Sequence, residues 1–481
     1  MQFNSYLFIL AFLPLTIICF FLAGRISALA RKLVLVCASI IFCACNDTRT
    51  LAVLLCSVLI NYAFTLLIKK CRWRKLFLAL PIIINVSLLL YFKYSNFFIL
   101  NLSYLLRRYI EPLYLFLPVG ISFFTFQQIA YLVAAYRNEL PDGSFLDYLV
   151  YILYFPKLLM GPLAEPVDFI AQLNAPDSGK LDLDHLAEGL KIFSFGLLKK
   201  VLLADTFAKA VNWGFNNTLT ASSLDWLLIM LFYTFQIYFD FSGYSDMAVG
   251  VSRMLNISLP INFDSPYKAL SIRDFWKRWH MSLTSFLTKY VYIPLGGSRK
   301  GRLFTYINTM IVFLVSGIWH GANWTFILWG ILHGLFSIFD RLTEKYQAKV
   351  FQPVRWMLTF LVINILWLLF RAESIMQWRD ILERAFSFQN MLVSNGLIAS
   401  FIVSEESFFS FLFHLGGLEE LVSGFWMLVF TIVSFGICLV PENNYRTLEE
   451  KSIPLMLIAA IALVWGVISL GGESIFIYSN F

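Results

Sequence analysis

Residues 306–339, YINTMIVFLVSGIWHGANWTFILWGILHGLFSIF, form an apolar run without a single Asp, Glu, Lys or Arg. A stretch of roughly 20 apolar residues is long enough to cross the hydrocarbon core of a bilayer, so the run predicts two consecutive membrane helices. His320 lies in its middle, in the sequence Trp319-His320-Gly321. An ionisable group is costly inside a membrane and usually faces a cavity or a substrate path. The run therefore predicts a membrane protein with a functional site near His320.

The composition of the whole chain agrees with this interpretation. Of its 481 residues 59% are hydrophobic and only 14% are charged, and the mean hydropathy is +0.72. These values lie outside the range of soluble globular proteins. Further apolar stretches occur at Tyr6–Ala23, Leu51–Ile68, Leu76–Phe92, Leu113–Ala135, Phe145–Leu163, Leu227–Phe239, Val354–Phe370, Gly424–Val440 and Ile453–Leu470. We expect an all-α polytopic membrane protein with about nine to twelve spans, some segments being re-entrant or interfacial.

Basic residues beside the first spans predict the orientation of the chain. Arg25, Arg31 and Lys32 follow the first apolar stretch, and a second basic cluster spans residues 69–75. Cytoplasmic loops are enriched in Lys and Arg, so we expect the N-terminus outside and both clusters inside. Without a repeat or a long linker, residues 1–481 are interpreted as one membrane domain. The seven cysteines show no zinc-ligand spacing, and we expect neither a metal site nor nucleic-acid binding.

Residues 268–302 form the most basic segment, with eight Lys or Arg residues and one acidic residue, Asp274. Trp276 and Trp279 follow helical spacing there, whereas Arg278 takes another face, as in an interfacial amphipathic helix. Anchoring to lipid headgroups explains this pattern. The segment also suits an anionic, phosphate-bearing acyl donor such as coenzyme A, and the two interpretations are compatible.

Two histidines and one buried carboxylate are the candidates for chemistry. On a continuous helix Ser316, His320 and Asn323 share one face, so the two polar neighbours could fix the imidazole tautomer. His280 closes the basic sequence forty residues earlier. Asp240 interrupts an apolar segment and could either orient a histidine or cap a broken helix. A histidine can also serve helix packing alone, which is the role that we expect for His333.

Five ordered blocks of sequence carry a family resemblance. They are Tyr238–Gly250 (YFDFSGYSDMAVG), Asn262–Leu283 (NFDSPYKALSIRDFWKRWHMSL), Tyr292–Gly301 (YIPLGGSRKG), Ser316–Trp324 (SGIWHGANW) and Leu328–Gly334 (LWGILHG). Together they resemble the signature blocks of the membrane-bound O-acyltransferase (MBOAT) family, most strongly over residues 110–375. The pattern is similar to the alginate O-acetyltransferase branch and to its relative, the D-alanyl transferase of teichoic acids. Asp264 departs from it, because asparagine is more usual there, and so do the last residues, Ser479-Asn480-Phe481.

The resemblance implies an MBOAT fold around a central funnel, with residues 110–375 as the catalytic core. His320 takes the place of the essential histidine and would act as general base on an acceptor hydroxyl, and His280 takes the second position and would position or polarise the donor. Asp240, Trp276, Arg278, Trp279, Ser316 and Asn323 become candidate substrate-binding residues. A covalent acyl-histidine route is an alternative.

The implied reaction transfers acetyl from cytoplasmic acetyl-CoA, or another acyl thioester or acyl carrier, toward an extracytoplasmic polysaccharide. No cofactor is expected to be bound permanently. Membrane lipids and an extracytoplasmic SGNH-type acetyltransferase are the expected partners, in a bacterial inner membrane. The alternatives are D-alanyl or other acyl transfer, a glycan transporter whose histidines relay protons, and a catalytically silent scaffold.

Overall fold

The computed structural model describes residues 1–141, 143–401, 419–441, 443, 445, 450, 452–471 and 476–477. Within these ranges the backbone forms helices and one isolated antiparallel bridge, between Phe263 and Trp279. The prediction of an all-α chain is therefore confirmed. The chain divides into two compact units, which are described separately; unit 1 contains Met1–Ser194 and Tyr244–Ile261, and unit 2 contains Phe195–Gly243 and Asn262–Ile477.

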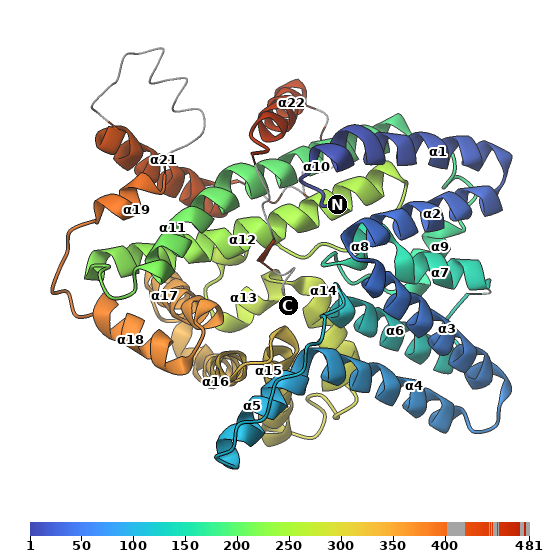
Figure 1. Ribbon diagram of the computed structural model, residues 1–481, viewed down its shortest axis with the longest axis horizontal. Helices are drawn as coiled ribbons and strands as arrows, with labels where there is room; N and C mark the ends of the chain where they lie inside the picture. The colour runs from blue at the N-terminus through green and yellow to red at the C-terminus, as the bar shows by residue number, and fades with distance from the viewer. Residues whose placement is uncertain are drawn as a thin grey trace. The chain divides into compact units, whose positions relative to one another are not determined.

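Unit 1 is built from the N-terminal helices (Figure 1). They are the π-helical turn η1 (Leu7–Phe12), α1 (Leu13–Ile26), α2 (Ala28–Asn46), α3 (Thr48–Lys70), α4 (Arg74–Leu89), the π-helical turn η2 (Leu90–Tyr94), α5 (Ser95–Leu105), α6 (Ile121–Tyr136), α7 (Phe145–Leu153), α8 (Phe155–Leu158), α9 (Pro166–Leu173) and the first part of α10 (Leu183–Leu198). Side-chain caps explain several of the helix starts: Ser27 caps α2, Asp47 caps α3, and Ser144 forms a capping box with Asp147 at α7.

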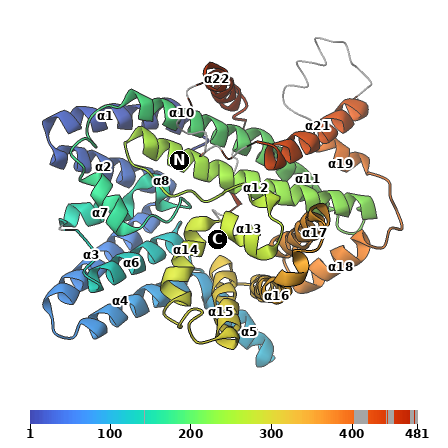
Figure 2. The ribbon, with the colours of Figure 1, turned by 180° about the vertical axis from the view of Figure 1, so that it is seen from behind.

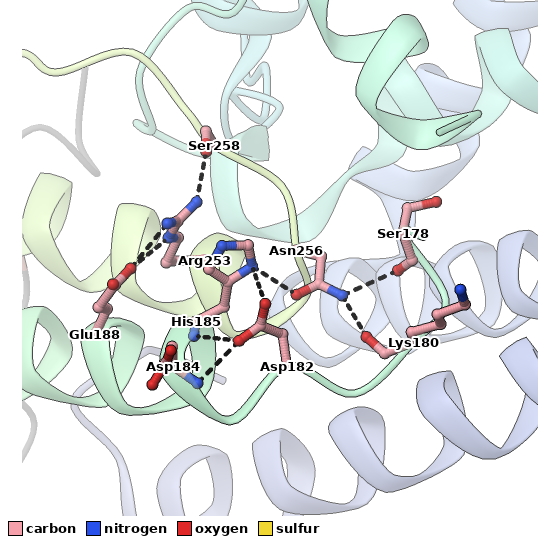
Figure 3. A network of polar contacts seen from close by, with 9 residues as sticks. All are labelled: Ser178, Lys180, Asp182, Asp184, His185, Glu188, Arg253, Asn256 and Ser258. Carbon is pink, nitrogen blue, oxygen red and sulfur yellow. Dashed lines mark hydrogen bonds and ion pairs between the residues drawn. The ribbon is translucent and has the colours of Figure 1, made fainter. Parts of the chain in front are cut away.

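A polar network within unit 1 joins the start of α10 to the end of α12 (Ser223–Met254) (Figure 3). Arg253 binds the carboxylate of Glu188 with N–O distances of 2.8 and 2.9 Å, and His185 Nδ1 lies 3.0 Å from Asn256 Oδ1. Asn256 also donates to the carbonyl oxygen of Lys180 at 2.7 Å. These hydrogen bonds indicate a structural role for His185.

Unit 2 contains the remaining helices, seen from behind in Figure 2. They are the end of α10, the π-helical turn η3 (Lys199–Ala204), α11 (Asp205–Asn216), α12 through Gly243, the 3-10 turn η4 (Pro266–Lys268), α13 (Ile272–Arg278), α14 (Met281–Leu287), the π-helical turn η5 (Thr288–Tyr292), α15 (Arg302–His320), α16 (Trp324–Gln347), α17 (Gln352–Arg371), α18 (Ile375–Ala385), α19 (Asn395–Ala399), α21 (Glu419–Leu439) and α22 (Ile453–Ile468). Helix α16 contacts both α15 and α17, and α13 contacts α16.

Nine helices in the described ranges are long and apolar enough to cross a membrane, at the lower end of the predicted number. They are Leu7–Ile26, Ala28–Asn46, Thr48–Lys70, Arg74–Leu105, Ser223–Met254, Arg302–His320, Trp324–Gln347, Gln352–Arg371 and Val422–Leu439. Three of the expected stretches differ, and one of them, Ile453–Leu470, contains a helix of only 16 residues, Ile453–Ile468. Phe145–Leu163 breaks into the short helices α7 and α8 at Tyr154, before Pro156, and the helical part of Leu113–Ala135 begins only at Ile121, after Pro118 and Gly120. Proline restricts the residue before it and so limits helix length.

Two glycines allow α15 and α16 to pack closely. A Cβ atom at Gly317 would lie 2.4 Å from the carbonyl oxygen of Phe326, and one at Gly330 would lie 2.5 Å from that of Phe313. Real Cβ atoms do not approach backbone so closely, so any larger residue would separate the helices. The close contact brings the end of α15, where His320 lies, beside the first turns of α16.

Candidate active site

His320 is the last residue of α15 and is enclosed by aromatic rings of unit 2. Its side chain is 3% exposed, and its ring centroid lies 4.9 Å from Trp319, 5.2 Å from Trp329 and 5.2 Å from Phe370. Helix α15 ends here because Gly321 adopts an extended conformation. The imidazole therefore lies in an apolar setting at the end of a helix.

The prediction that Ser316, His320 and Asn323 share one helix face is wrong for Asn323. The helix ends at His320, and Asn323 instead caps the next helix, α16, by accepting a hydrogen bond from the backbone N–H of Thr325 at 3.1 Å. Its amide also donates to the carbonyl oxygen of Glu373 at 2.9 Å. Ser316 does lie on the same helix as His320, one turn earlier, and is buried.

His280 lies between α13 and α14 in a left-handed backbone conformation, with φ of +46°. Such a conformation is unfavourable for a residue with a Cβ atom and often marks a functional site. The side chain is 1% exposed, and Phe241 packs edge to face against its ring at 4.7 Å. Complete burial lowers the pKa of His280 from 6.5 to about 3, so the ring is neutral at physiological pH.

The hydrogen bonds around His280 fix its tautomer. Its Nδ1 lies 3.3 Å from Asn262 Oδ1, and the same oxygen accepts hydrogen bonds from Ser282 N at 3.3 Å and Ser282 Oγ at 2.6 Å. Because a backbone N–H must donate, the Asn262 atom is the carbonyl oxygen, and Nδ1 of the histidine carries the proton. Nε2 is therefore a hydrogen-bond acceptor, and it has no partner within the described part of the chain.

Trp319 connects the two histidines. Its ring centroid lies 6.3 Å from that of His280, and it is the direct neighbour of His320 in the sequence. Unit 2 thus places both predicted histidines around one indole, although they are forty residues apart in the chain.

The aromatic residues of the basic segment point into unit 2 and not outward. Trp276 and Trp279 are both buried, and Trp279 packs against Phe263 and Trp367 with centroid distances of 4.9 and 4.8 Å. Both indoles are therefore part of the protein interior, whereas the anchoring of the basic segment to lipid headgroups stays a prediction. Lys277, between them in the sequence, is exposed.

Arg278 and Asp240 are engaged in other interactions. Arg278 pairs with Asp274 at 2.9 Å and donates to the carbonyl oxygen of Asp264. Asp240 binds Lys200 at 2.7 Å and accepts a hydrogen bond from the backbone N–H of Ile477 at 2.9 Å. Because α12 continues through Gly243, Asp240 does not cap a broken helix, and the described contacts of its carboxylate include no histidine. Both residues therefore have structural partners.

A cavity of about 270 Å³ lies in unit 2, between the helices that precede and follow the two histidines. Its lining comes from α13, α14, η5, α15 and α16, and includes Trp276, Ser316 and Ser337, which are buried. Lys277, Arg273 and Arg341 also line it and are more exposed. A second hollow of about 490 Å³ shares Lys277, Thr284 and Thr288 with the first and adds Lys289 and Ser285. A basic, hydroxyl-lined entrance therefore leads into a largely apolar cavity.

Two residues of α16 belong to this site although the sequence analysis assigned them no catalytic role. Trp329 is completely buried against His320, and His333 packs against Trp329 with a centroid distance of 4.6 Å. Trp276 Nε1 donates to His333 Nδ1 at 3.1 Å. Only the four-residue spacing from Trp329 to His333 within the LWGILHG block could have indicated that they share a face.

Comparison with known proteins identifies the family. The family model of MBOAT, the membrane-bound O-acyltransferase family, matches residues 40–376. The peptidoglycan O-acetyltransferase of Helicobacter pylori is 41% identical over 407 residues, which cover 78% of this chain and 77% of that protein. A probable alginate O-acetylase AlgI of Pseudomonas putida is 37% identical over 404 residues, 82% of each chain. The teichoic acid D-alanyltransferase of Streptococcus thermophilus is 31% identical over 236 residues, 45% of this chain and 55% of that protein.

The match covers the helices that carry both histidines and the cavity beside them. With nine apolar helices in the described ranges, the protein is a multi-pass membrane acyltransferase. This chain belongs to the membrane-bound O-acyltransferase family.

Proposed function

We propose that the protein transfers acetyl groups from a cytoplasmic thioester, acetyl-CoA, to a polysaccharide of the cell envelope. The observation that carries the proposal is the cavity of unit 2, whose lining combines the exposed Lys277 with the buried Ser316, one helical turn before His320 on α15. A basic, hydroxyl-lined entrance suits phosphate groups, and an apolar interior suits the arm that carries the thioester. The choice of acetyl and of a glycan acceptor rests on the O-acetyltransferase relatives, which match far more of this chain than the D-alanyl transferase does.

The charges at the entrance favour Lys277 and Arg341 as phosphate-binding groups. Arg273 also lines the cavity, but its guanidinium pairs with Glu344 at 3.2 Å, which offsets part of its charge. Lys277 is exposed and belongs to both hollows. A diphosphate held there would place the rest of the donor along the buried lining residues Trp276 and Ser316.

His320 acts as the general base in the proposed mechanism. It removes the proton of an acceptor hydroxyl as the oxygen attacks the thioester carbonyl carbon. The C–S bond then breaks, the acetyl group stays on the acceptor oxygen, and the proton leaves with the thiol. An aromatic enclosure keeps water from competing for the acetyl group.

His280 positions the donor and does not polarise its carbonyl. Its Nδ1–H is held by Asn262, so the neutral ring presents only the acceptor nitrogen Nε2. A hydrogen-bond acceptor such as Nε2 can bind an amide N–H of the acetyl-CoA arm, whereas polarising a carbonyl requires a hydrogen-bond donor.

We place the protein in a bacterial inner membrane with its N-terminus outside and propose that an SGNH-type extracytoplasmic acetyltransferase completes transfer to the glycan.

The first prediction concerns the two histidines. In membranes with matched protein levels, His320→Ala should lower acetyl transfer from radiolabelled acetyl-CoA by about 100-fold or more, the usual contribution of a general base. His280→Ala should lower it mainly by weakening donor binding. His185→Ala, which removes a surface histidine of the unit 1 network, is the matched control and should retain activity. Full activity of His320→Ala would show that the proposed mechanism is wrong.

The second prediction concerns the entrance. Lys277→Ala and Arg341→Ala should each raise the KM for acetyl-CoA with little change in kcat, because they remove binding that is the same in the ground and transition states. Lys300→Ala is the control, since Lys300 does not line either hollow. Initial rates at varied acetyl-CoA concentration provide the test. If all three variants keep the wild-type KM for acetyl-CoA, the phosphate-binding role is wrong, and lipid-headgroup anchoring remains as the explanation of the basic segment.

The third prediction follows from the neutral state of His280. Its pKa is about 3 in the folded protein and near 6.5 when unfolded, so folding favours the neutral form. The stability that this provides is complete above pH 6.5 and is lost as the pH falls toward 3. Between pH 7 and pH 5 the wild type should lose about 2 kcal/mol more than His280→Asn, which cannot titrate. Unfolding in detergent at both pH values measures this difference, and parallel losses would contradict a buried, neutral His280.

A further inference from the structure

Acyl transfer needs a hydrogen-bond donor that neither histidine supplies. As the acceptor oxygen attacks, negative charge develops on the thioester oxygen, and fixed N–H or O–H groups in a dry site stabilise it. His280 presents an acceptor nitrogen, and His320 acts as a base in the proposed function. The donor must therefore come from another part of the site.

One face of α16 carries polar groups at intervals of four residues. Trp329, His333, Ser337 and Arg341 follow this spacing, so they lie one above another on the helix. Arg341 and Ser337 line the cavity. His333 and Trp329 continue the row toward the N-terminal end of the helix, where Trp329 packs against His320. The row thus runs along α16 from Arg341 and Ser337 at the cavity to Trp329 against His320, and its inner members, His333 and Trp329, lie beyond the residues that line the hollow.

Three members of this row have a buried polar atom without a partner in the described part of the chain. They are Trp329 Nε1, His333 Nε2 and Ser337 Oγ, and the side chains are 0%, 1% and 4% exposed. Buried polar groups almost always find a hydrogen-bond partner, because an unpaired group loses its bonds to water without replacement. Three such atoms in one row leave this face of α16 with hydrogen-bonding capacity that a bound group can use.

Two of these groups, Trp329 Nε1 and His333 Nε2, carry a hydrogen atom and can donate it. An indole Nε1 always carries a proton and can only donate. His333 Nδ1 accepts the hydrogen bond of Trp276 Nε1 at 3.1 Å, so a neutral His333 carries its proton on Nε2. Both are therefore donors, and their rings lie 4.6 Å apart.

We propose that Trp329 Nε1–H and His333 Nε2–H bind the thioester carbonyl oxygen and stabilise the negative charge that forms on it. This inference rests on the proposed function, because it needs an acyl thioester as substrate. The carbonyl π electrons move to the oxygen as the new C–O bond forms, and both N–H groups hold that oxygen. The electrons return as the C–S bond breaks, and the thiolate takes the proton from His320. Trp276 is a positioning residue here, since it keeps the His333 proton on Nε2.

Trp329→Phe is the central test, because it removes the N–H and keeps an aromatic ring. With acetyl-CoA as donor, kcat should fall by about 100-fold with little change in KM, as when one oxyanion donor is lost. His333→Gln, which can still donate from its amide, should retain more activity than His333→Leu. Trp226→Phe is the matched control: Trp226 is also completely buried, and its Nε1 also has no partner within the described residues, but it packs against Phe215 and lies outside the cavity lining.

A second measurement separates this role from a packing role. In the His320→Ala background, which binds the donor without turnover, the infrared carbonyl stretch of [1-¹³C]acetyl-CoA reports hydrogen bonding to the thioester oxygen. Adding Trp329→Phe should shift this band to higher frequency, whereas adding Trp226→Phe should leave it unchanged. If Trp329→Phe does not yield folded protein, the His333→Gln and His333→Leu pair is measured in the same way.

The outcomes distinguish this inference from the proposed function. A wild type that cleaves no acetyl-CoA contradicts the proposed function itself. A wild type that is active, together with a fully active Trp329→Phe and an unshifted carbonyl band, overturns the oxyanion role. A fall in kcat with the band shift supports it.

Discussion

The close approach of α15 and α16 is the contact on which the site depends. It is made possible by Gly317 and Gly330, each of which faces the backbone of the other helix at a distance that admits no Cβ atom. Because α15 ends at His320 while α16 begins at Trp324, this contact brings a helix terminus against the side of Trp329. A separation of the two helices would open the aromatic enclosure of His320 and displace the polar row of α16.

Hydrogen bonds to buried neighbours set the tautomers of two histidines, His280 and His333. His280 has its proton held on Nδ1 by Asn262, and His333 accepts at Nδ1 from Trp276. The two rings therefore carry opposite tautomers, one offering an acceptor Nε2 and the other a donor Nε2. In the proposed mechanism this difference lets one ring position a donor amide while the other binds the carbonyl oxygen.

The membrane helices and the family could be predicted from the sequence because long apolar runs and short motifs are local features, and the same motifs made His280 and His320 the candidate catalytic residues, which stay a prediction. The end of α15 could not be located from the sequence. A continuous helix would have put Asn323 on the same face as His320, but α15 ends before Gly321, and Asn323 caps the start of α16. Helical spacing alone also does not tell a surface from a protein interior, so the burial of Trp276 and Trp279 was not predictable. The donor character of His333 depends on Trp276, fifty-seven residues away, and no local pattern reveals such a bond. The central funnel and the single domain stay predictions.

The position of the bound thioester tests the account most directly. A cryo-electron-microscopy structure of His320→Ala with acetyl-CoA should place the diphosphate beside Lys277 and Arg341, and the thioester carbonyl oxygen within hydrogen-bond distance of Trp329 Nε1 and His333 Nε2. A donor bound elsewhere, or a carbonyl oxygen directed away from α16, would contradict the account.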